Sequence, residues 1–274
     1  MRKTPTLTYF ALVIATLLSL GPFYFMFIIA TRKLEVINAV PPPFLPGGEF
    51  GENFGRVLDN EHAAFMYGLM NSIVVSSVIT ISVVFFSSLA GFAFAKLRFT
   101  GKNVMLLVII ATMMIPTQLG VIPLFDMMVN WFDLGGNLSA VILPFLVSGF
   151  GVFMMRQYAA SAVSDELIEA ARVDGCTTFR IYWSVVLPAL RPAMGVLGLL
   201  TFMEQWNSFL WPYAILDADT PTVQVSLALL SSAYYTDYAQ VFAATAVATV
   251  PLLIVFVIFG RQIIGGIMEG AVKA

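Results

Sequence analysis

The side chains that could do acid–base or ion-pair chemistry are concentrated in one stretch of the chain, residues 164–192. Six charged residues fall there within 16 positions: Asp165, Glu166, Glu169, Arg172, Asp174 and Arg180. A phosphate-binding Walker A loop is excluded, because Lys96 stands where a glycine is needed five residues before Gly101. His62 is the only histidine and Cys176 the only cysteine, so we expect no metal site and no Ser-His-Asp set. The chain is therefore not expected to be an enzyme.

A short helix, a glycine turn and a second helix are expected to position these charges. Ser164 is a favourable N-cap, and Asp165 and Glu166 place negative charge in the first turn, where the helix dipole favours it. Gly175 suits the left-handed residue that ends such a helix. Thr177 or Thr178 can cap the next one.

An apolar stripe is expected along the first of these helices, from Leu167, Ile168 and Ala171, with Ala170 widening it. The second helix should end where Leu187-Pro188 turns the chain back into apolar sequence. From these residues alone, an amphipathic loop resting on the membrane surface remains an alternative.

The order of residues in this stretch resembles the EAA loop of the inner-membrane permeases of ABC importers. Glu169-Ala170-Ala171 is followed after three residues by Gly175, and after a further eleven by Leu-Pro. The family has isoleucine two residues before the Leu-Pro, where Val185 stands here. In that family the loop is a coupling helix that docks into a cleft of the ATPase subunit. The resemblance implies a coupling set of Glu169, Ala170, Ala171, Asp174, Gly175, Leu187 and Pro188.

The composition excludes a soluble domain, since 59% of the 274 residues are hydrophobic and 11% are charged. Apolar runs of about 20 residues can cross a bilayer. Six are present, at about 7–30, 66–95, 103–125, 138–156, 189–214 and 241–264. The first has too long an apolar core for a signal peptide, so we expect an uncleaved span. The sequence predicts an all-α polytopic membrane protein with six transmembrane helices and a cytoplasmic coupling helix-turn-helix.

The distribution of basic residues predicts the orientation. With both termini in the cytoplasm, eleven Lys and Arg residues lie inside and three outside, namely Arg32, Lys33 and Arg56. The predicted location is the cell (inner) membrane. Residues 32–65 form the longest outer loop, which its prolines and acids predict to be extended and solvated. Asn53-Phe54 within it resembles the "NF" element of sugar-importer permeases, or is a turn followed by an anchoring aromatic.

The fifth run holds the candidate solute residues. Glu204 is the only carboxylate within a predicted span, and a buried charge there should face protein or water. Trp206, Asn207, Phe209 and Pro212 form a WN-x-F-x-x-P pattern that resembles a signature of maltose-type permeases. Glu204 and Asn207 share a helix face, whereas Trp206 points elsewhere and is expected to contact a partner permease. The alternative is that these residues are a polar group and an aromatic belt at the outer interface of the membrane.

Gln118 is a further candidate for the solute path. It follows Pro116 in the third run, where proline and a polar group indicate either a packed kink or part of the path. Residues 221–230 and 233–238 resemble a subgroup that imports cellobiose or related oligosaccharides.

The C-terminal sequence resembles the GAVKG ending of the maltose-type permease that reaches the ATPase dimer, with Ala274 in place of the last glycine. This implies that Gly270, Ala271, Val272 and Lys273 contact the ATPase; a frayed terminus is the alternative. The resemblance runs from about residue 50 to the end. We divide the chain into the first helix and outer loop (1–65), the transmembrane domain (66–264) and a cytoplasmic tail (265–274).

The resemblance implies a permease subunit that forms half of a sugar or oligosaccharide pathway. Its expected partners are an ATPase dimer, a second permease, an extracytoplasmic solute-binding protein and membrane lipid, with no nucleic acid. ATP and magnesium would be used by the ATPase, and no cofactor by this chain. A secondary transporter, a non-sugar ABC permease and an intramembrane enzyme are the alternatives. A secondary transporter would usually show inverted repeats, and none is evident in this sequence.

Overall fold

The computed structural model describes residues 6–37, 43–231 and 236–271, with side chains up to residue 260. This part of the chain is helical apart from an isolated bridge between Ser231 and Thr236. Five segments are long and apolar enough to cross a membrane: Thr6–Ala30, Phe65–Lys96, Leu138–Ala162, Thr178–Trp206 and Tyr238–Gly260. The pair Lys102–Thr112 and Thr117–Trp131 makes a sixth if it is counted as one bent span. The all-helical, multi-span prediction is confirmed.

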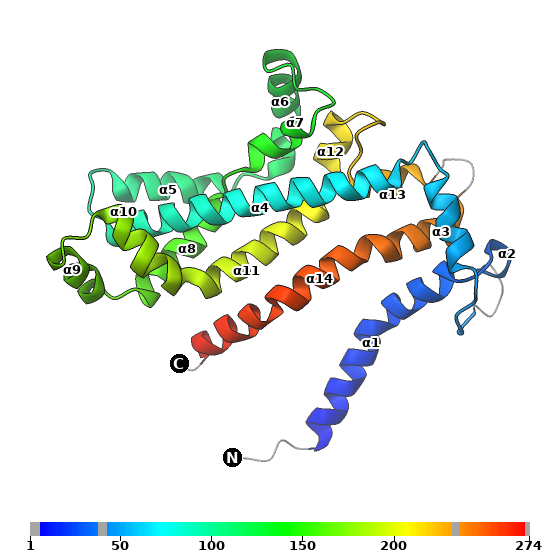
Figure 1. Ribbon diagram of the computed structural model, residues 1–274, viewed down its shortest axis with the longest axis horizontal. Coiled ribbons are helices and arrows are strands. Elements are labelled where there is room, and N and C mark those ends of the chain that lie inside the picture. Colours follow the sequence, from blue (N-terminus) through cyan, green and yellow to red (C-terminus); the bar gives the residue numbers. More distant parts are fainter. Residues whose placement is uncertain (1–5, 38–42, 232–235, 272–274) are drawn as a thin grey trace.

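The third span is bent by 89° between α5 (Lys102–Thr112) and the helical segment Thr117–Trp131. Pro116 lies in the break, where its missing N–H and its restriction of the preceding residue prevent a continuous helix. The chain is therefore bent at this proline, but residues 111–119 are exposed, so the bend is not the packed kink that was expected. Beyond it, α6 (Val121–Asp126) stands away from the main body of helices (Figure 1).

The body of the molecule is organised around α4 (Phe65–Lys96), which packs against α8 (Gly149–Ala162) and α11 (Leu187–Trp206). Lipid is as apolar as the helix surfaces, so close van der Waals fit has to hold such helices together. Gly91 permits this fit, because a Cβ atom there would lie 2.7 Å from the backbone carbon of Met155 on α8. A small residue of α4 therefore serves helix packing at this position.

The first and last long helices are α1 (Thr6–Ala30) and α14 (Tyr238–Ala271), and α14 lies against both α1 and α11. Most of α1 is exposed, and only Ile28, Ile29 and Ala30 at its end are buried. In Figure 1 the start of α1 and the end of α14 both point toward the end of the molecule that holds α9 (Asp165–Val173). The opposite end holds α2 (Leu34–Ile37), α3 (Phe50–Leu58) and α13 (Val223–Leu229).

The composition of the long outer loop had predicted an extended chain, but the loop is not extended throughout. It contains α2 and the amphipathic α3, whose Asn53 and Val57 are buried. Asn53 donates from Nδ2 to the carbonyl oxygens of Ala30 and Arg32, both at 2.9 Å. These bonds satisfy carbonyls at the end of α1 that have no partner in the helix, so α3 is held in place by capping α1.

Candidate coupling site

The first helix of the charged stretch, α9, begins and ends as its sequence predicts. The Ser164 side chain accepts a hydrogen bond from the backbone N–H of Leu167. At the other end, Gly175 has φ +74°. Its N–H bonds to the Arg172 carbonyl at 3.0 Å, and the Cys176 N–H bonds to the Ala171 carbonyl at 2.9 Å. This pair of bonds is a Schellman motif, which fixes the direction of the chain after the helix.

The two acids of the first turn have pKa values below their ordinary ones. A hydrogen bond from the Lys96 ammonium, together with the charges of Lys96 and Arg98, lowers the pKa of Asp165. For Glu166, its own backbone N–H and the Ser164 hydroxyl lower the pKa. Both carboxylates are therefore ionised at neutral pH and complement the positive end of the helix dipole.

The inward face of α9 differs from the predicted stripe. Ile168 is buried and Ala171 is half-buried against the main core, but Leu167 is 55% exposed and Ala170 is exposed. A nine-residue helix with one side against the protein can bury only positions three or four apart, and Leu167 lies about 100° from Ile168. The stripe is therefore narrower than expected.

The outward face of α9 combines acidic and apolar side chains. Glu169, Ala170 and Asp174 are exposed, and Val173 is 88% exposed. An apolar side chain exposed to this degree beside carboxylates is suited to contact with another protein surface. Of the expected coupling set, Glu169, Ala170 and Asp174 are therefore exposed on or beside α9, whereas Ala171 packs against the core and Gly175 lies in the turn. Leu187 and Pro188 lie on α11.

The basic turn after α4 holds the start of α9, a contact that sequence reasoning did not identify. Lys96 Nζ lies 2.8 Å from Asp165 Oδ1 and 3.5 Å from the Ala160 carbonyl oxygen. The Lys96 side chain is only 9% exposed, whereas that of Asp165 is 76% exposed. The spacing of 69 residues between the partners left no local signal for the pair.

The second helix does not end at Leu187-Pro188 as expected. Thr177 caps α10 (Thr178–Ile181), whose chain passes through a π-helical turn, Tyr182–Val186, directly into α11. A π turn widens the helix, and proline lacks the N–H that a regular turn would use, so the wide turn before Pro188 lets the helix continue. Leu187 is half-buried and Pro188 is exposed. The loop is therefore one free helix followed by the first turns of a span.

Tyr182 in the π turn makes a second connection to α4. Its hydroxyl lies 2.8 Å from Ser88 Oγ, and its ring packs against that of Phe92 at 5.9 Å between centroids. Tyr182 is 1% exposed. Lys96 and Ser88 thus join α4 to both sides of the Gly175 turn. Because of these two contacts, the turn and the transmembrane helices should move together.

The candidate solute residues fall into different environments. Glu204 and Asn207 are exposed, but α11 ends at Trp206, so Asn207 caps the helix and its Nδ2 bonds to the Met203 carbonyl at 2.8 Å. The predicted fifth run to residue 214 is broken there, since a separate helix, α12 (Leu210–Ile215), accommodates Pro212 in its first turn. Gln118 is exposed in the 3-10 turn Thr117–Gly120, on another element.

Trp206 was expected to contact a partner permease, and this expectation is wrong. The side chain is 1% exposed within the chain's own second core and stacks on Phe202, with 5.6 Å between ring centroids. Helices α3, α4, α13 and α14 supply most of the other residues of this core. The burial of Trp206 could not be predicted from local sequence, because the residues that cover it come from distant segments.

An ion pair on the side opposite α9 was also missed. The Arg56 guanidinium on α3 pairs with Asp237, beside the start of α14, and donates to Asn53 Oδ1 at 2.6 Å. Gln240 Nε2 donates to the Arg56 carbonyl at 2.7 Å. Asp237 is 9% exposed, so Arg56 compensates a largely buried carboxylate. Asn53 belongs to this network, whereas the ring of Phe54 packs against those of Phe50 and Phe65. Asn53 and Phe54 both lie in the helix α3 and not in a turn.

Several apolar spans packed around α4, with a capped surface helix at one end, define an all-helical polytopic membrane protein. Residues 83–265 match the model of the family described as "Binding-protein-dependent transport system inner membrane component", and the chain belongs to this family. It is therefore a multi-pass inner-membrane component of a binding-protein-dependent ABC importer, a class that works with an ATPase and a solute-binding protein.

Individual relatives agree with this assignment along nearly the whole chain. The arabinooligosaccharides transport system permease protein AraQ of Halalkalibacterium halodurans is 33% identical over 95% of this chain and 97% of its own length. The sn-glycerol-3-phosphate transport system permease protein UgpE of Yersinia enterocolitica is 29% identical over 94% of each chain. A solved bacterial ABC transporter involved in import of the acidic polysaccharide alginate matches with a TM-score of 0.79 at 25% identity, over 93% of this chain and 94% of that one.

Proposed function

We propose that the outward face of α9 is the contact through which a separate ATPase drives this permease. The observation that carries the proposal is the combination of exposure and rigidity. Glu169, Ala170 and Val173 are exposed on a helix that is capped at both ends and tied to α4 by Lys96. A surface that moves with the transmembrane body can transmit a displacement, whereas a flexible loop would absorb it.

The proposed cycle is a two-state exchange. ATP with magnesium binds the ATPase dimer and closes it, the cleft holding α9 moves as a rigid body, and the spans pass from an inward-facing to an outward-facing arrangement. The solute-loaded binding protein favours the outward-facing state. Gly175, Leu187 and Pro188 serve this coupling by fixing the turn and the wide helical segment through which α9 joins α11.

The remaining partners follow from the same proposal. A second permease supplies the other half of the pathway, and both termini of this chain lie in the cytoplasm on the side of α9. The excess of basic residues on that side supports this orientation. Gly270 and Ala271 are the last residues of α14 and would continue toward the ATPase. Val272 and Lys273 lie outside the described residues.

The proposed solute is a sugar or oligosaccharide. Exposed carboxylate and amide groups at Glu204 and Asn207 could accept from and donate to sugar hydroxyls. AraQ, by its name, transports arabinooligosaccharides, which supports this class. A glycerol phosphate is the second candidate because of the similarity to UgpE. The resemblance of residues 221–230 and 233–238 to cellobiose importers stays a prediction, and residues 233–235 lie outside the described part.

Reconstitution tests the proposal. The chain would be placed in proteoliposomes with its partner permease, ATPase and binding protein, and ATP hydrolysis measured with arabinooligosaccharides, cello-oligosaccharides, maltose or glycerol 3-phosphate. Stimulation and uptake with an oligosaccharide are expected. Uptake of glycerol 3-phosphate alone would replace the sugar assignment, and uptake that persists without the ATPase would overturn the coupling.

A further inference from the structure

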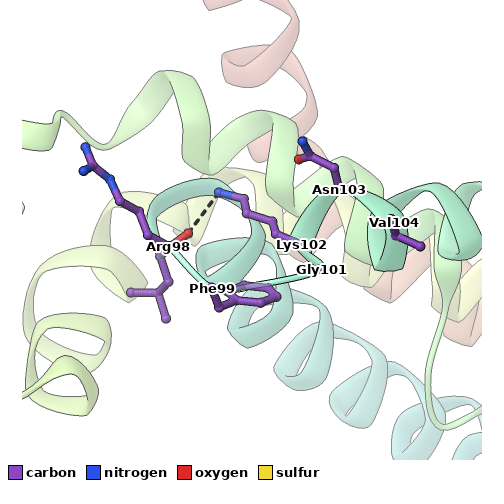
Figure 2. Close-up of a pocket in the computed structure, with 7 residues that line it drawn as sticks. Arg98, Phe99, Gly101, Lys102, Asn103 and Val104 are labelled. Atoms are coloured by element: carbon purple, nitrogen blue, oxygen red, sulfur yellow. Dashed lines mark hydrogen bonds between the residues drawn. The ribbon is translucent and has the colours of Figure 1, made fainter.

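The turn between α4 and α5 forms a pocket that the coupling site does not use. Its volume is about 420 Å³, and it is lined by Leu97, Arg98, Phe99, Gly101, Lys102, Asn103 and Val104 (Figure 2). It lies between Lys96, where α4 ends, and Lys102, where α5 begins. Because both helices are apolar and belong to adjacent candidate spans, the pocket lies at the level of a membrane surface.

The turn that forms the pocket holds basic side chains and no acid, and the nearby carboxylate of Asp165 on α9 is close enough for Lys96 and Arg98 to lower its pKa. Residues 96–104 contain three basic side chains and no acidic one. Lys96 is paired with Asp165, but neither Arg98 nor Lys102 forms an ion pair within the described part of the chain. Lys102 Nζ donates to the carbonyls of Ala95 and Leu97, at 3.4 and 3.0 Å, which fixes its ammonium group inside the turn (Figure 2). Arg98 is exposed.

An apolar surface begins at the edge of this charged pocket. Phe99 in the turn is 40% exposed, and along α5 the exposed fractions are 66% for Val104, 53% for Met105, 66% for Leu107 and 57% for Val108. A fixed basic pocket that continues into an exposed apolar helix matches a molecule with an anionic head and long apolar chains. A soluble anion would use only the first of these features, and an acidic protein segment would leave the second uncovered.

We propose that this turn binds the headgroup of an anionic phospholipid, with its phosphate between Arg98 and Lys102 and its acyl chains along α5. The side of the membrane is that of α9, because Lys96 of the same turn bonds to Asp165. That this is the cytoplasmic leaflet rests on the proposed function. Basic pockets between transmembrane helices on the cytoplasmic side are known to bind the headgroups of anionic lipids. A lipid in this position would steady the turn from which α9 is held.

The test uses the purified importer complex in nanodiscs of phosphatidylcholine, alone or with increasing phosphatidylglycerol. Native mass spectrometry counts the phosphatidylglycerol that the complex retains, and its thermal midpoint is followed in parallel. Arg98→Gln removes one charge from an exposed side chain, and Arg98→Lys keeps it. Arg191→Gln is the matched control, because Arg191 is exposed on α11 and does not line the pocket.

Wild type, Arg98→Lys and Arg191→Gln should retain phosphatidylglycerol. Arg98→Gln should bind it about fivefold more weakly, which is the effect of losing one basic residue at a membrane surface. Equal retention by Arg98→Gln, or equal loss in Arg191→Gln, overturns the proposal. So does a loss of ATPase subunit from Arg98→Gln in phosphatidylcholine alone, since the pocket would then bind protein. Lipid retention is measured without a transported solute, so the lipid-binding result can be interpreted even if the proposed transport function is wrong.

Discussion

Lys96 Nζ and Asp165 Oδ1 lie 2.8 Å apart, so the last residue of α4 is bonded to the first residue of α9. The lysine is nearly buried and also reaches the Ala160 carbonyl at the end of α8. One ammonium group therefore joins three helices at the point where the surface helix leaves the transmembrane body. Its loss should free α9 without altering the face that docks.

The stabilisation from the Lys96–Asp165 ion pair should depend on pH only under acidic conditions. Lys96 lowers the Asp165 pKa in the folded protein, so the stabilisation is complete above the ordinary value of 3.8 and is lost as the pH falls through the lower, folded-state pKa. Asp165→Asn should therefore lower the thermal midpoint by a constant amount from pH 5 to 8. The difference should shrink below pH 3.8. A difference that changes across the neutral range would contradict this assignment of the ion pair.

Glu169→Lys should leave the chain inserted and stop solute-stimulated ATP hydrolysis. In the family, the acidic face of this helix meets a basic residue of the ATPase, and two like charges at a buried interface cost several kcal/mol. Glu169→Gln, which removes charge without reversing it, should retain more coupling. The measurement is ATP hydrolysis and uptake in proteoliposomes. Normal uptake by the lysine variant would reject the assignment of α9 as coupling helix.

Gly175→Val should uncouple transport through the backbone alone. At φ +74° a residue with a side chain is strained by about 1–2 kcal/mol, and a β-branched one by more, although a Cβ atom would meet nothing within 4 Å. Gly175→Asn is the matched control, because asparagine tolerates this conformation. Coupled ATP hydrolysis should fall for valine and survive for asparagine. Equal activity of the two variants would show that the turn geometry does not matter.

Trp206→Ala should lower stability by roughly 3–5 kcal/mol, the usual result of emptying a packed aromatic site. The loss should appear as a lower thermal midpoint and a lower yield of complex. Glu204→Ala and Asn207→Ala, both at exposed side chains, should instead assemble normally and reduce uptake. Wild-type rate and apparent affinity in both polar variants would show that the end of α11 does not touch the solute.

Deleting residues 270–274 should reduce coupling or assembly while leaving insertion intact. The expectation rests on the resemblance of this ending to the tail that enters the ATPase dimer of maltose-type importers. Complex yield and uptake rate are the two readouts. If neither changes, the tail is passive.

Local features of the site were predictable from sequence, and contacts between distant segments were not. Ser164, Gly175 and Thr177 act as a cap, a left-handed turn and a second cap because each role depends on a residue and its immediate neighbours. The spans followed from apolar runs, and the bend in the third from Pro116. These inferences need only local conformational preferences.

The misses share a different cause. Trp206 was assigned outward because its helical phase differs from that of Glu204, but α3, α13 and α14 cover that face as well. The partners of Lys96 and Arg56 lie 69 and 181 residues away, so no spacing rule connects them. The outer loop was predicted to be extended from its prolines, although Asn53 gains two capping bonds by folding into α3.

The Arg56–Asp237 pair has a consequence for exchanging parts between related permeases. The family match covers residues 83–265, which include Asp237 and Gln240 but leave Asn53 and Arg56 outside. A chimaera cut at the edge of this match would carry a nearly buried carboxylate into a protein that lacks its guanidinium partner. Such hybrids should fail to fold unless residues 53–56 and 237–240 come from the same parent. The unit that can be transplanted is therefore larger than the segment that matches the family model.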